Sequence, residues 1–262
     1  MKGSPMTSDI FEKKLRIRSE HVNRSRILRT SSLFRLLQET SIAHTTELGF
    51  GRDKTLDRGL LWIISRQVLQ ISRMPRYDDD ILIRSWPGDM LHVFFPRFYE
   101  IWNGGECAVR GEALWLLMDE QSRTMVFPNE YGILIPGIPD GPPSGITSAI
   151  RAPEDAAPVF SEVLKPRFSQ TDINGHINNA NYFDIIDDLL PEEIPSACFP
   201  VRIEAEYLTE IRPDNTVTVR GFRNPAGIWY IDGIAGEDVR SAPVPAARPL
   251  FRIRETFASI NR

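Results

Sequence analysis

Apolar positions recur with a helical period at one place in each half of the chain. These two stripes predict helices over residues 30–48 and 179–190, and each helix follows a short basic strand and a loop. Gly49 is suited to end the first helix, and Pro191 stops the second. We expect Thr30, Ser31 or Ser32 to cap the first helix. The stripes consist of Leu33, Leu36, Leu37, Thr40, Ala43 and Leu48 in the first half, and of Tyr182, Ile185, Ile186 and Leu189 in the second.

Several apolar, β-prone runs follow each predicted helix, and turn residues separate them. A long helix followed by strands favours an α+β unit in which the helix lies on an antiparallel sheet. One such unit leaves a sheet edge uncovered, so two are expected to pair. The strand candidates are LLWIISRQVLQI, DILIRSW, VFFPRFYEIW and GEALWLLMD in the first half, and FPVRIEAEYLTEI, NTVTVRGF, IWYIDGIAG and RPLFRIRETF in the second.

The two halves resemble each other, and a connecting segment lies between them. Residues 134–160 are rich in Pro, Gly, Ser and Ala without an amphipathic period, which indicates a linker between domains at 1–133 and 161–262. A shift of 149 residues lays Arg18 on Arg167 and Leu33 on Tyr182. A shift of 136 lays residues 81–83 on 217–219, so we interpret the chain as a degenerate internal repeat.

Composition excludes several classes of protein. The chain of 262 residues is 42% hydrophobic, which is enough for one large core or two smaller ones, and its net charge of −4 argues against nucleic-acid binding. It has no long apolar run and starts with polar residues, so we expect a soluble, cytoplasmic protein without membrane insertion. Cys107 and Cys198 lie far apart without metal-site spacing, and the chain has no HExxH, P-loop or GxGxxG motif, so we expect neither a metal nor a cofactor.

The segment from Lys165 to Asp188, KPRFSQTDINGHINNANYFDIIDD, contains the best candidates for chemistry. Asp172, Asn174 and His176 alternate just before the second helix, and in an extended chain they would point to one face. Asn178 or Asn179 could then cap that helix, whose free N–H groups would stabilise an oxyanion. Turn formation and capping are the alternative roles for such residues.

DINGHINNANY resembles the D-x-N-x-H-V-N-N-x-x-Y signature of plant and bacterial acyl-ACP thioesterases, and EAEYLTEIRPDNTV resembles their second block. The first half is similar to their N-terminal domain in LLQETSIAHTTELGFG, in GLLWIISRQVLQISRMPRYDDDILIRSWP and in ALWLLMDEQSR. The resemblance implies a tandem (double) hot-dog fold and hydrolysis of fatty-acyl thioesters on acyl carrier protein (ACP). It implies an active site of Asp172, Asn174, His176 and Glu210, with the acyl pocket shaped by the first domain.

At one position the chain departs from the family pattern. Where the family often has a cysteine after the glutamate, this chain has Ile211, so we expect no cysteine nucleophile. Without the family spacing, Glu204, Glu206 and Glu210 would be interpreted as one solvated face of a strand. The same shifts place Asn23, Ser25, Ile27 and Met74 at the four site positions in the first half, which predicts one catalytic centre per chain.

Two mechanisms stay open on the sequence alone: attack by a water that His176 and Glu210 activate, or attack by Asp172 through an acyl anhydride. An acyl-CoA thioesterase of the same fold and a non-catalytic acyl-binding protein are the alternative functions.

Residues 1–35 contain nine Lys and Arg residues and three acids, and this basic cluster could bind acidic ACP or form a solvated face. A homodimer also stays open. The predicted ACP-binding residues are Arg16, Arg18, Arg24, Arg26, Arg29 and Arg167.

Overall fold

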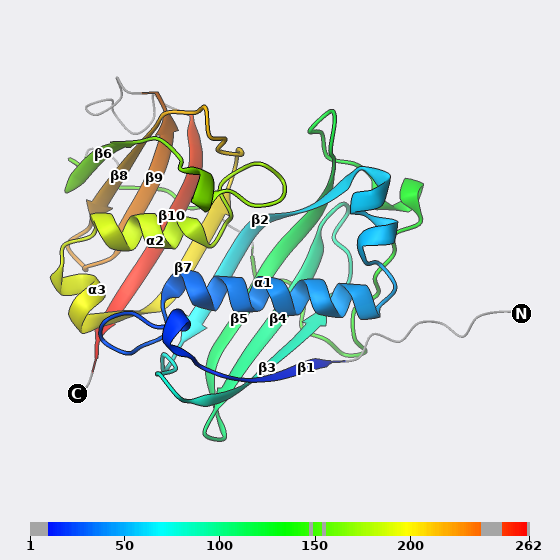
Figure 1. Ribbon diagram of the computed structural model, residues 1–262, viewed down its shortest axis with the longest axis horizontal. Helices are drawn as coiled ribbons and strands as arrows, with labels where there is room; N and C mark the ends of the chain where they lie inside the picture. The colour runs from blue at the N-terminus through cyan, green and yellow to red at the C-terminus, as the bar shows by residue number, and fades with distance from the viewer. Residues whose placement is uncertain (1–9, 147–148, 154–155, 237–247, 261–262) are drawn as a thin grey trace, which may run out of the picture.

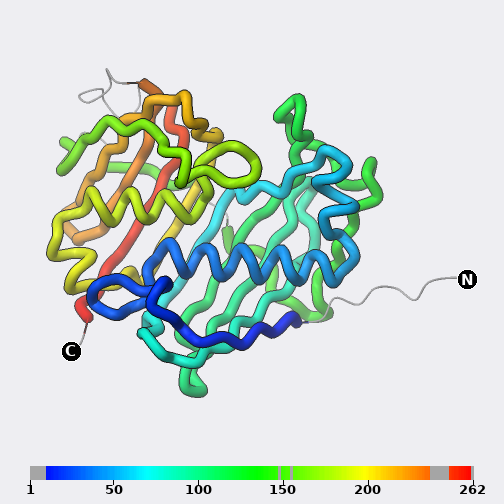
Figure 2. The backbone as a smooth tube through the Cα atoms, viewed as in Figure 1, coloured from blue at the N-terminus to red at the C-terminus, as the bar shows by residue number. Residues whose placement is uncertain are grey.

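The computed structural model describes residues 10–146, 149–153, 156–236 and 248–260. In this part of the chain a ten-stranded antiparallel sheet carries the main helices on one face (Figures 1 and 2). The strands are β1 Phe11–Arg16, β2 Leu60–Ile71, β3 Asp80–Pro87, β4 Phe95–Asn103, β5 Glu106–Asp119, β6 Phe160–Leu164, β7 Cys198–Tyr207, β8 Val217–Arg223, β9 Trp229–Ala235 and β10 Pro249–Ser259. The α-helices are α1 Thr30–Glu47, α2 Asn181–Leu189 and α3 Glu193–Ala197, and short 3-10 helices lie at Ser19–His21, Arg52–Lys54, Leu56–Arg58, Pro128–Tyr131 and Phe168–Gln170.

The sheet consists of two five-stranded halves joined edge to edge. Its order is β1-β3-β4-β5-β2 in the first half and β7-β10-β9-β8-β6 in the second. β2 pairs with β7 from Arg66 opposite Glu206 to Gln70 opposite Arg202. The predicted class, a helix on an antiparallel sheet in each half, is confirmed.

The predicted helices are present, but their first residues differ from the expectation. Thr30, Ser31 and Ser32 lie buried inside α1, and the N-cap is Arg29, which makes no side-chain cap. α2 is half as long as α1 and begins after Ala180. The side chain of Asn178 accepts a hydrogen bond from Ala180 N–H at 2.9 Å, so it stabilises the turn before the helix rather than capping the helix itself.

The two main helices contact each other across the junction of the halves. The Phe34 ring of α1 lies 4.0 Å from the Phe183 ring of α2, measured between centroids. Arg35 of α1 forms an ion pair with Asp184 of α2 at 2.8 Å. Buried apolar side chains from both halves form one cluster, so the halves share a continuous core.

Two turns with the same hydrogen bonds support the internal repeat. In the turn of residues 23–27, the backbone N–H of Asn23 donates to the Ile27 carbonyl at 2.9 Å. In the turn of residues 172–176, the backbone N–H of Asp172 donates to the His176 carbonyl at 3.0 Å. The first side chain accepts from the third N–H at 2.9 and 2.8 Å. The residue after each turn also makes the same kind of bond: Leu28 N–H donates to the Pro75 carbonyl, and Ile177 N–H donates to the Ile211 carbonyl, both at 2.8 Å. These pairs are related by the shifts of 149 and 136 residues.

The described part of residues 134–160 packs against the sheet. Ser144 and Gly145 both donate hydrogen bonds to Glu112 of β5, and Ile150 is buried. Glu112 lies opposite Phe98 in the register, whereas the neighbouring Tyr99 bonds to α1. Residues 144–145 therefore lie on the face away from the helices. The domain limits at 133 and 161 stay a prediction. None of the helices in the described ranges is long and apolar enough to cross a membrane.

Two carboxyl groups lie between α2 and β10. Glu255 is buried, and burial together with the charge of Asp187 raises its pKa well above the usual value. Burial raises the pKa of Asp187 to about 7, and Asp184 and Asp188 add to the effect. Because the folded-state pKa of Asp187 is raised, its stabilising contribution is present at low pH and is lost as the pH rises through about 7.

We predict that Asp187→Asn stabilises the protein above neutral pH, because asparagine keeps no charge there. The free energy of unfolding at pH 8 should rise by on the order of 1 kcal/mol, with little change at pH 4. Urea unfolding at both pH values measures this, with exposed Asp214→Asn as the control. An equal gain at both pH values would contradict the assignment.

Candidate active site

A tight turn, rather than an extended strand, brings the predicted site residues together. Asp172 accepts the N–H of Asn174 through its side chain and the N–H of Gly175 through its backbone, at 2.8 and 3.1 Å. Gly175 has a φ of +79°, a conformation that favours glycine. The expectation of an alternating extended segment is therefore wrong, although the side chains do converge.

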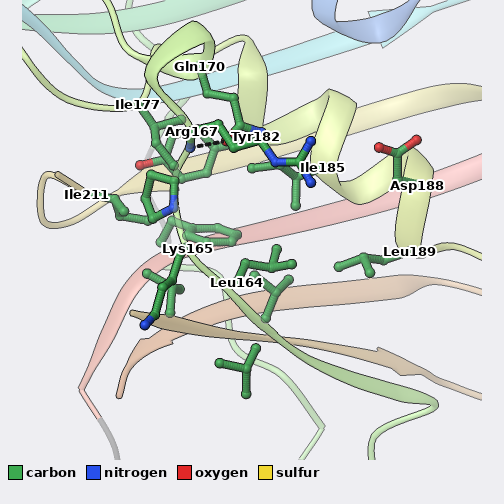
Figure 3. A pocket seen from close by; sticks show the side chains of 15 residues that line it. Leu164, Lys165, Arg167, Gln170, Ile177, Tyr182, Ile185, Asp188, Leu189 and Ile211 are labelled. Atoms are coloured by element: carbon green, nitrogen blue, oxygen red, sulfur yellow. Dashed lines mark hydrogen bonds between the residues drawn. The ribbon is translucent and has the colours of Figure 1, made fainter. Parts of the chain in front are cut away.

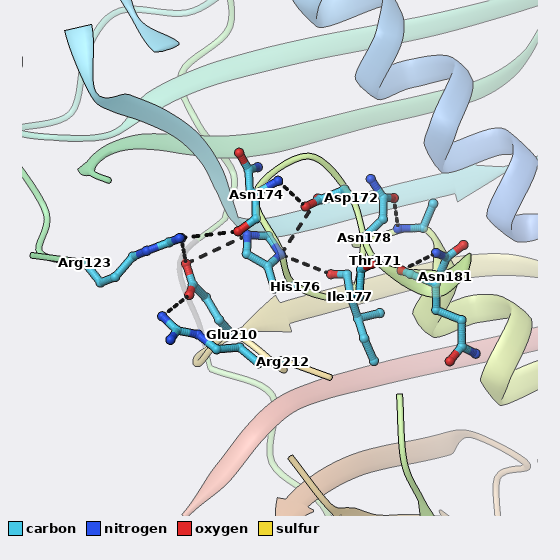
Figure 4. A network of polar contacts seen from close by, with 12 residues as sticks. Arg123, Thr171, Asp172, Asn174, His176, Ile177, Asn178, Asn181, Glu210 and Arg212 are labelled. Carbon is cyan, nitrogen blue, oxygen red and sulfur yellow. Dashed lines mark hydrogen bonds and ion pairs between the residues drawn. The ribbon is translucent and has the colours of Figure 1, made fainter. Parts of the chain in front are cut away.

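The ring of His176 lies between two carboxylates (Figure 4). Its Nδ1 is 3.8 Å from Asp172 Oδ2, and its Nε2 is 3.8 Å from Glu210 Oε1. These are ion-pair distances and too long for direct hydrogen bonds. His176 is 7% exposed, and its Nε2 has no hydrogen-bond partner among the described residues. A buried ring nitrogen without a hydrogen-bond partner is suited to bind a water or a substrate atom.

A small space beside His176 matches this need. A cavity of about 30 Å³ is lined by Asp172, Asn174 and His176 from the second half and by Trp62 and Trp115 from the first. That volume is roughly one water molecule's share of the liquid. Water can therefore meet the imidazole at the junction of the halves.

Glu210 lies in a loop and not on the predicted strand, because β7 ends at Tyr207. Its side chain is 18% exposed, so it does not point freely to solvent. Glu204 and Glu206 do alternate on β7, but both are buried. Glu204 pairs with Arg202 and Arg254, and Glu206 lies 3.3 Å from Arg66. The alternative of a solvated face is thus wrong for this strand.

Arg123 is a site residue that the sequence did not indicate. It follows β5 in the first half, yet its Nη1 lies 3.0 Å from Glu210 Oε1 and its Nη2 donates to the Asn174 carbonyl at 3.3 Å. Arg212 approaches the other Glu210 oxygen at 3.4 Å. Two cations therefore hold the carboxylate beside the imidazole (Figure 4). The sequence DEQSR does not mark Arg123 as a site residue, because the role of Arg123 depends on its contact with Glu210, which lies 87 residues further along the chain.

A larger cavity extends from the site into the first half. It measures about 500 Å³ and is lined by Asp172, Asn174 and Asn178 of the site and by residues of α1, β2, β4 and β5. Much of the wall is apolar, which suits an acyl chain whose reacting end lies at the polar turn. Apolar lining residues include Ile42, Phe50, Leu60, Trp62, Phe95 and Trp115.

The equivalent turn of the first half is closed by contacts with the second. Ser25 donates to the Ser196 carbonyl at 2.8 Å, and Arg24 pairs with Glu192 at 2.6 Å. Ile27 and Met74, at the positions of His176 and Glu210, are buried apolar side chains. This turn therefore lacks both the chemistry and the open space of the site at residues 172–176.

The predicted ACP-binding arginines do not line the 500 Å³ cavity. Arg16 pairs with Asp80 at 2.7 Å, Arg24 pairs with Glu192, and Arg29 donates to the Glu20 carbonyl. Arg18 and Arg26 are exposed; Arg26 is part of the first-half turn, and Arg18 precedes that turn in the chain.

Arg167 lines a separate cavity of about 620 Å³ beneath α2, together with Lys165 and apolar residues (Figure 3). Neither this cavity nor the two others described above is lined by Cys107 or Cys198. Burial also raises the pKa of the Cys107 thiol.

Two family models match the chain: the acyl-ACP thioesterase N-terminal domain over residues 8–130 and the C-terminal domain over residues 154–228. The chain belongs to the acyl-ACP thioesterase family. A similar curated relative is a palmitoyl-acyl carrier protein thioesterase of Cuphea hookeriana, 25% identical over 84% of this chain and 56% of its own length. An oleoyl-acyl carrier protein thioesterase of Arabidopsis thaliana is 25% identical over 79% of this chain and 62% of its own length.

Solved structures share the fold of this family member. The 12:0-ACP thioesterase from Umbellularia californica has a TM-score of 0.79 at 18% identity, covering 96% of this chain and 98% of that one. An acyl-ACP thioesterase from Bacteroides thetaiotaomicron has a TM-score of 0.77 at 19% identity, covering 95% and 98%. The predicted tandem hot-dog fold is confirmed. The chain spans slightly more than half the length of the Cuphea relative.

We predict that Arg123→Met lowers kcat on a thioester substrate by about tenfold or more, with a smaller effect on KM, because Glu210 loses a charge-assisted partner. Arg123→Lys should restore part of kcat, since it keeps the charge but not the planar fork. Steady-state kinetics measure both. Arg110→Met is the control, because Arg110 is 67% exposed and pairs with Glu100 away from the site. Equal losses in Arg123→Met and the control would contradict this role.

Proposed function

We propose that this chain hydrolyses fatty-acyl-ACP thioesters to free fatty acid and ACP. The observation that carries the proposal is His176 between two carboxylates, in a turn whose residues Asp172 and Asn174 line a largely apolar cavity. Membership of the family supports the same substrate class, and the named relatives are acyl-carrier-protein thioesterases.

In the mechanism that the contacts favour, His176 Nε2 removes a proton from a water held in the small cavity beside it. Glu210, fixed by Arg123, stabilises the resulting imidazolium. The Ile177 carbonyl, 3.3 Å from His176 Nδ1, orients the ring together with the nearby charge of Asp172. The water oxygen bonds to the thioester carbonyl carbon. The Asn174 side chain, which lines the cavity, is suited to stabilise the oxyanion. The C–S bond then breaks, and His176 returns its proton to the thiolate.

A covalent route through Asp172 is the second mechanism. It would require a carboxylate oxygen of Asp172 to reach the substrate carbonyl and form an acyl anhydride. One of these oxygens accepts the Asn174 N–H, and the other lies toward His176. These contacts favour an orienting role for Asp172 and so support the water route. Rapid quenching during turnover, followed by mass spectrometry of the protein, distinguishes the two, because only the covalent route leaves an acyl group on Asp172.

The direct test is turnover of acyl-ACPs and acyl-CoAs with chains of different length. We predict that His176→Ala, Asp172→Ala and Glu210→Ala each lower kcat by about a hundredfold or more. Asn174→Ala should raise the barrier by about 2–4 kcal/mol. The double variant Cys107→Ala/Cys198→Ala should keep most of the activity and is the control.

Two outcomes would contradict this proposal. An inactive double-cysteine variant would require a thiol nucleophile. Absence of turnover of every acyl thioester by the wild type would favour a non-catalytic acyl-binding protein. Preference for CoA over ACP carriers would instead support the acyl-CoA thioesterase alternative, because the chemistry at the thioester is the same.

For ACP docking we propose the predicted arginines as contacts. Arg18, Arg26 and Arg167 are the strongest candidates because they are exposed and, unlike Arg16 and Arg24, form no ion pair with an acid of the described residues. Charge reversal to Glu at these positions should raise KM for acyl-ACP severalfold and leave kcat/KM for short N-acetylcysteamine thioesters almost unchanged. Lys54→Glu, an exposed cation outside this set, is the matched control. Equal effects on both substrates would contradict docking at these residues. A cytoplasmic location and a homodimer remain predictions.

A further inference from the structure

A buried arginine lies on the wall of the proposed acyl cavity. Arg97 of β4 is 4% exposed and lines the cavity of about 500 Å³. Its Nη1 contacts His44 Nδ1 at 2.9 Å and donates to Ser85 Oγ at 3.2 Å. Its Nη2 donates to Thr45 Oγ1 at 3.1 Å, and Thr45 lines the same cavity. The guanidinium is therefore anchored on the side of the cavity formed by α1.

None of these partners carries a negative charge. Burial and the nearby Arg97 lower the pKa of His44 to about 4, so His44 is neutral at pH 7 and accepts the hydrogen bond. Arg97 has a pKa lowered to about 10 by burial and remains a cation. No carboxylate in the described ranges lies within ion-pair distance of it. Glu39 and Asp172, the acids on the cavity wall, are not within that distance either.

The other buried arginine of the described residues is paired with an acid. Arg220 is 1% exposed and forms two hydrogen bonds to Asp232, at 2.9 and 2.7 Å. A buried cation without a counter-ion loses its hydration and gains no Coulomb energy in return. A guanidinium has five N–H donors, and the side-chain contacts of Arg97 occupy three of them. Arg97 thus has both charge and donors available for a ligand.

The position of Arg97 places such a ligand away from the thioester. In the sheet order, β5 and β2 lie between β4 and β7, the strand that leads to Glu210. Three strand spacings correspond to about 14 Å. An acyl chain whose carbonyl carbon lies at His176 and that follows the cavity across these strands would bring its distal part to Arg97.

We propose that the acyl group this site accepts carries an oxygen acceptor on its distal part, a carboxylate above all, which binds Arg97. This inference rests on the proposed thioesterase function and names its substrate class. A carboxylate neutralises the cation and can accept two parallel hydrogen bonds. A hydroxyl or keto oxygen accepts a hydrogen bond without neutralising the charge, and a terminal methyl group does neither.

The test compares thioesters of one length on one carrier: decanoyl, 10-hydroxydecanoyl and the monothioester of decanedioic acid. Wild type should show kcat/KM at least tenfold higher for the carboxylate form than for decanoyl, with the hydroxyl form between them. Arg97→Met should abolish this preference, so that the ratio of kcat/KM for the carboxylate form to kcat/KM for decanoyl falls about ten- to a hundredfold. Arg97→Lys should keep part of the preference.

A binding measurement on wild type keeps the proposal testable if Arg97→Met fails to fold. Free decanedioate should raise the Tm of wild type more than decanoate does. Arg84→Met is the matched control, because Arg84 pairs with Glu12 and Glu100 outside the cavity, and it should keep the preference.

If wild type hydrolyses decanoyl at least as well as the oxygenated chains, the inference is overturned and thioesterase function stands. If no thioester is hydrolysed, the proposed function fails. In that case stronger binding of decanedioate than decanoate, lost in Arg97→Met, would still support an anion site, and equal binding would overturn it.

Discussion

The pairing of β2 with β7 is the interaction on which the rest of this structure depends. It joins two five-stranded sheets into one through five opposed residue pairs. Leu69 and Ile203 face each other across it and are both fully buried. Each such apolar side chain contributes on the order of 1.5–3 kcal/mol. Arg66 and Glu206 form an ion pair at one end of the same seam.

The seam also creates the site, because neither half contains it alone. The turn with Asp172 and His176 belongs to the second half, whereas the apolar cavity and Arg123 belong to the first. Arg123 reaches Glu210 because the end of β5 and the loop after β7 are brought together across β2. A shift of one residue in the seam would turn each inward side chain of β2 outward and separate these groups.

The two halves show how one local geometry can serve different purposes. Both contain the same five-residue turn with the same hydrogen bonds. In the second half it positions a carboxylate and an imidazole, which leaves the buried Nε2 of His176 without a partner and open to chemistry. In the first half Asn23 and Ile27 occupy the equivalent positions, and contacts with Glu192 and Ser196 close the turn. Buried Arg97 shows similar specialisation, since its charge is offset by no acid of the described chain, unlike that of Arg220.

Local patterns in the sequence determined the elements and the candidate chemistry. Apolar periodicity located α1 and α2 to within two residues, and β-prone runs located most strands, because a helix face or a strand face is specified by neighbours in the chain. The family motif indicated Asp172, Asn174, His176 and Glu210, and the repeat indicated the inactive counterparts in the first half. Only the tertiary structure decided the tight turn at Gly175, the loop position of Glu210, the contacts of Arg123 and the lack of an acid near Arg97. The contact of Arg123 with Glu210 joins residues that meet because β2 and β7 pair, and the surroundings of Arg97 depend on the packing of α1 against β3 and β4. No local period encodes either meeting.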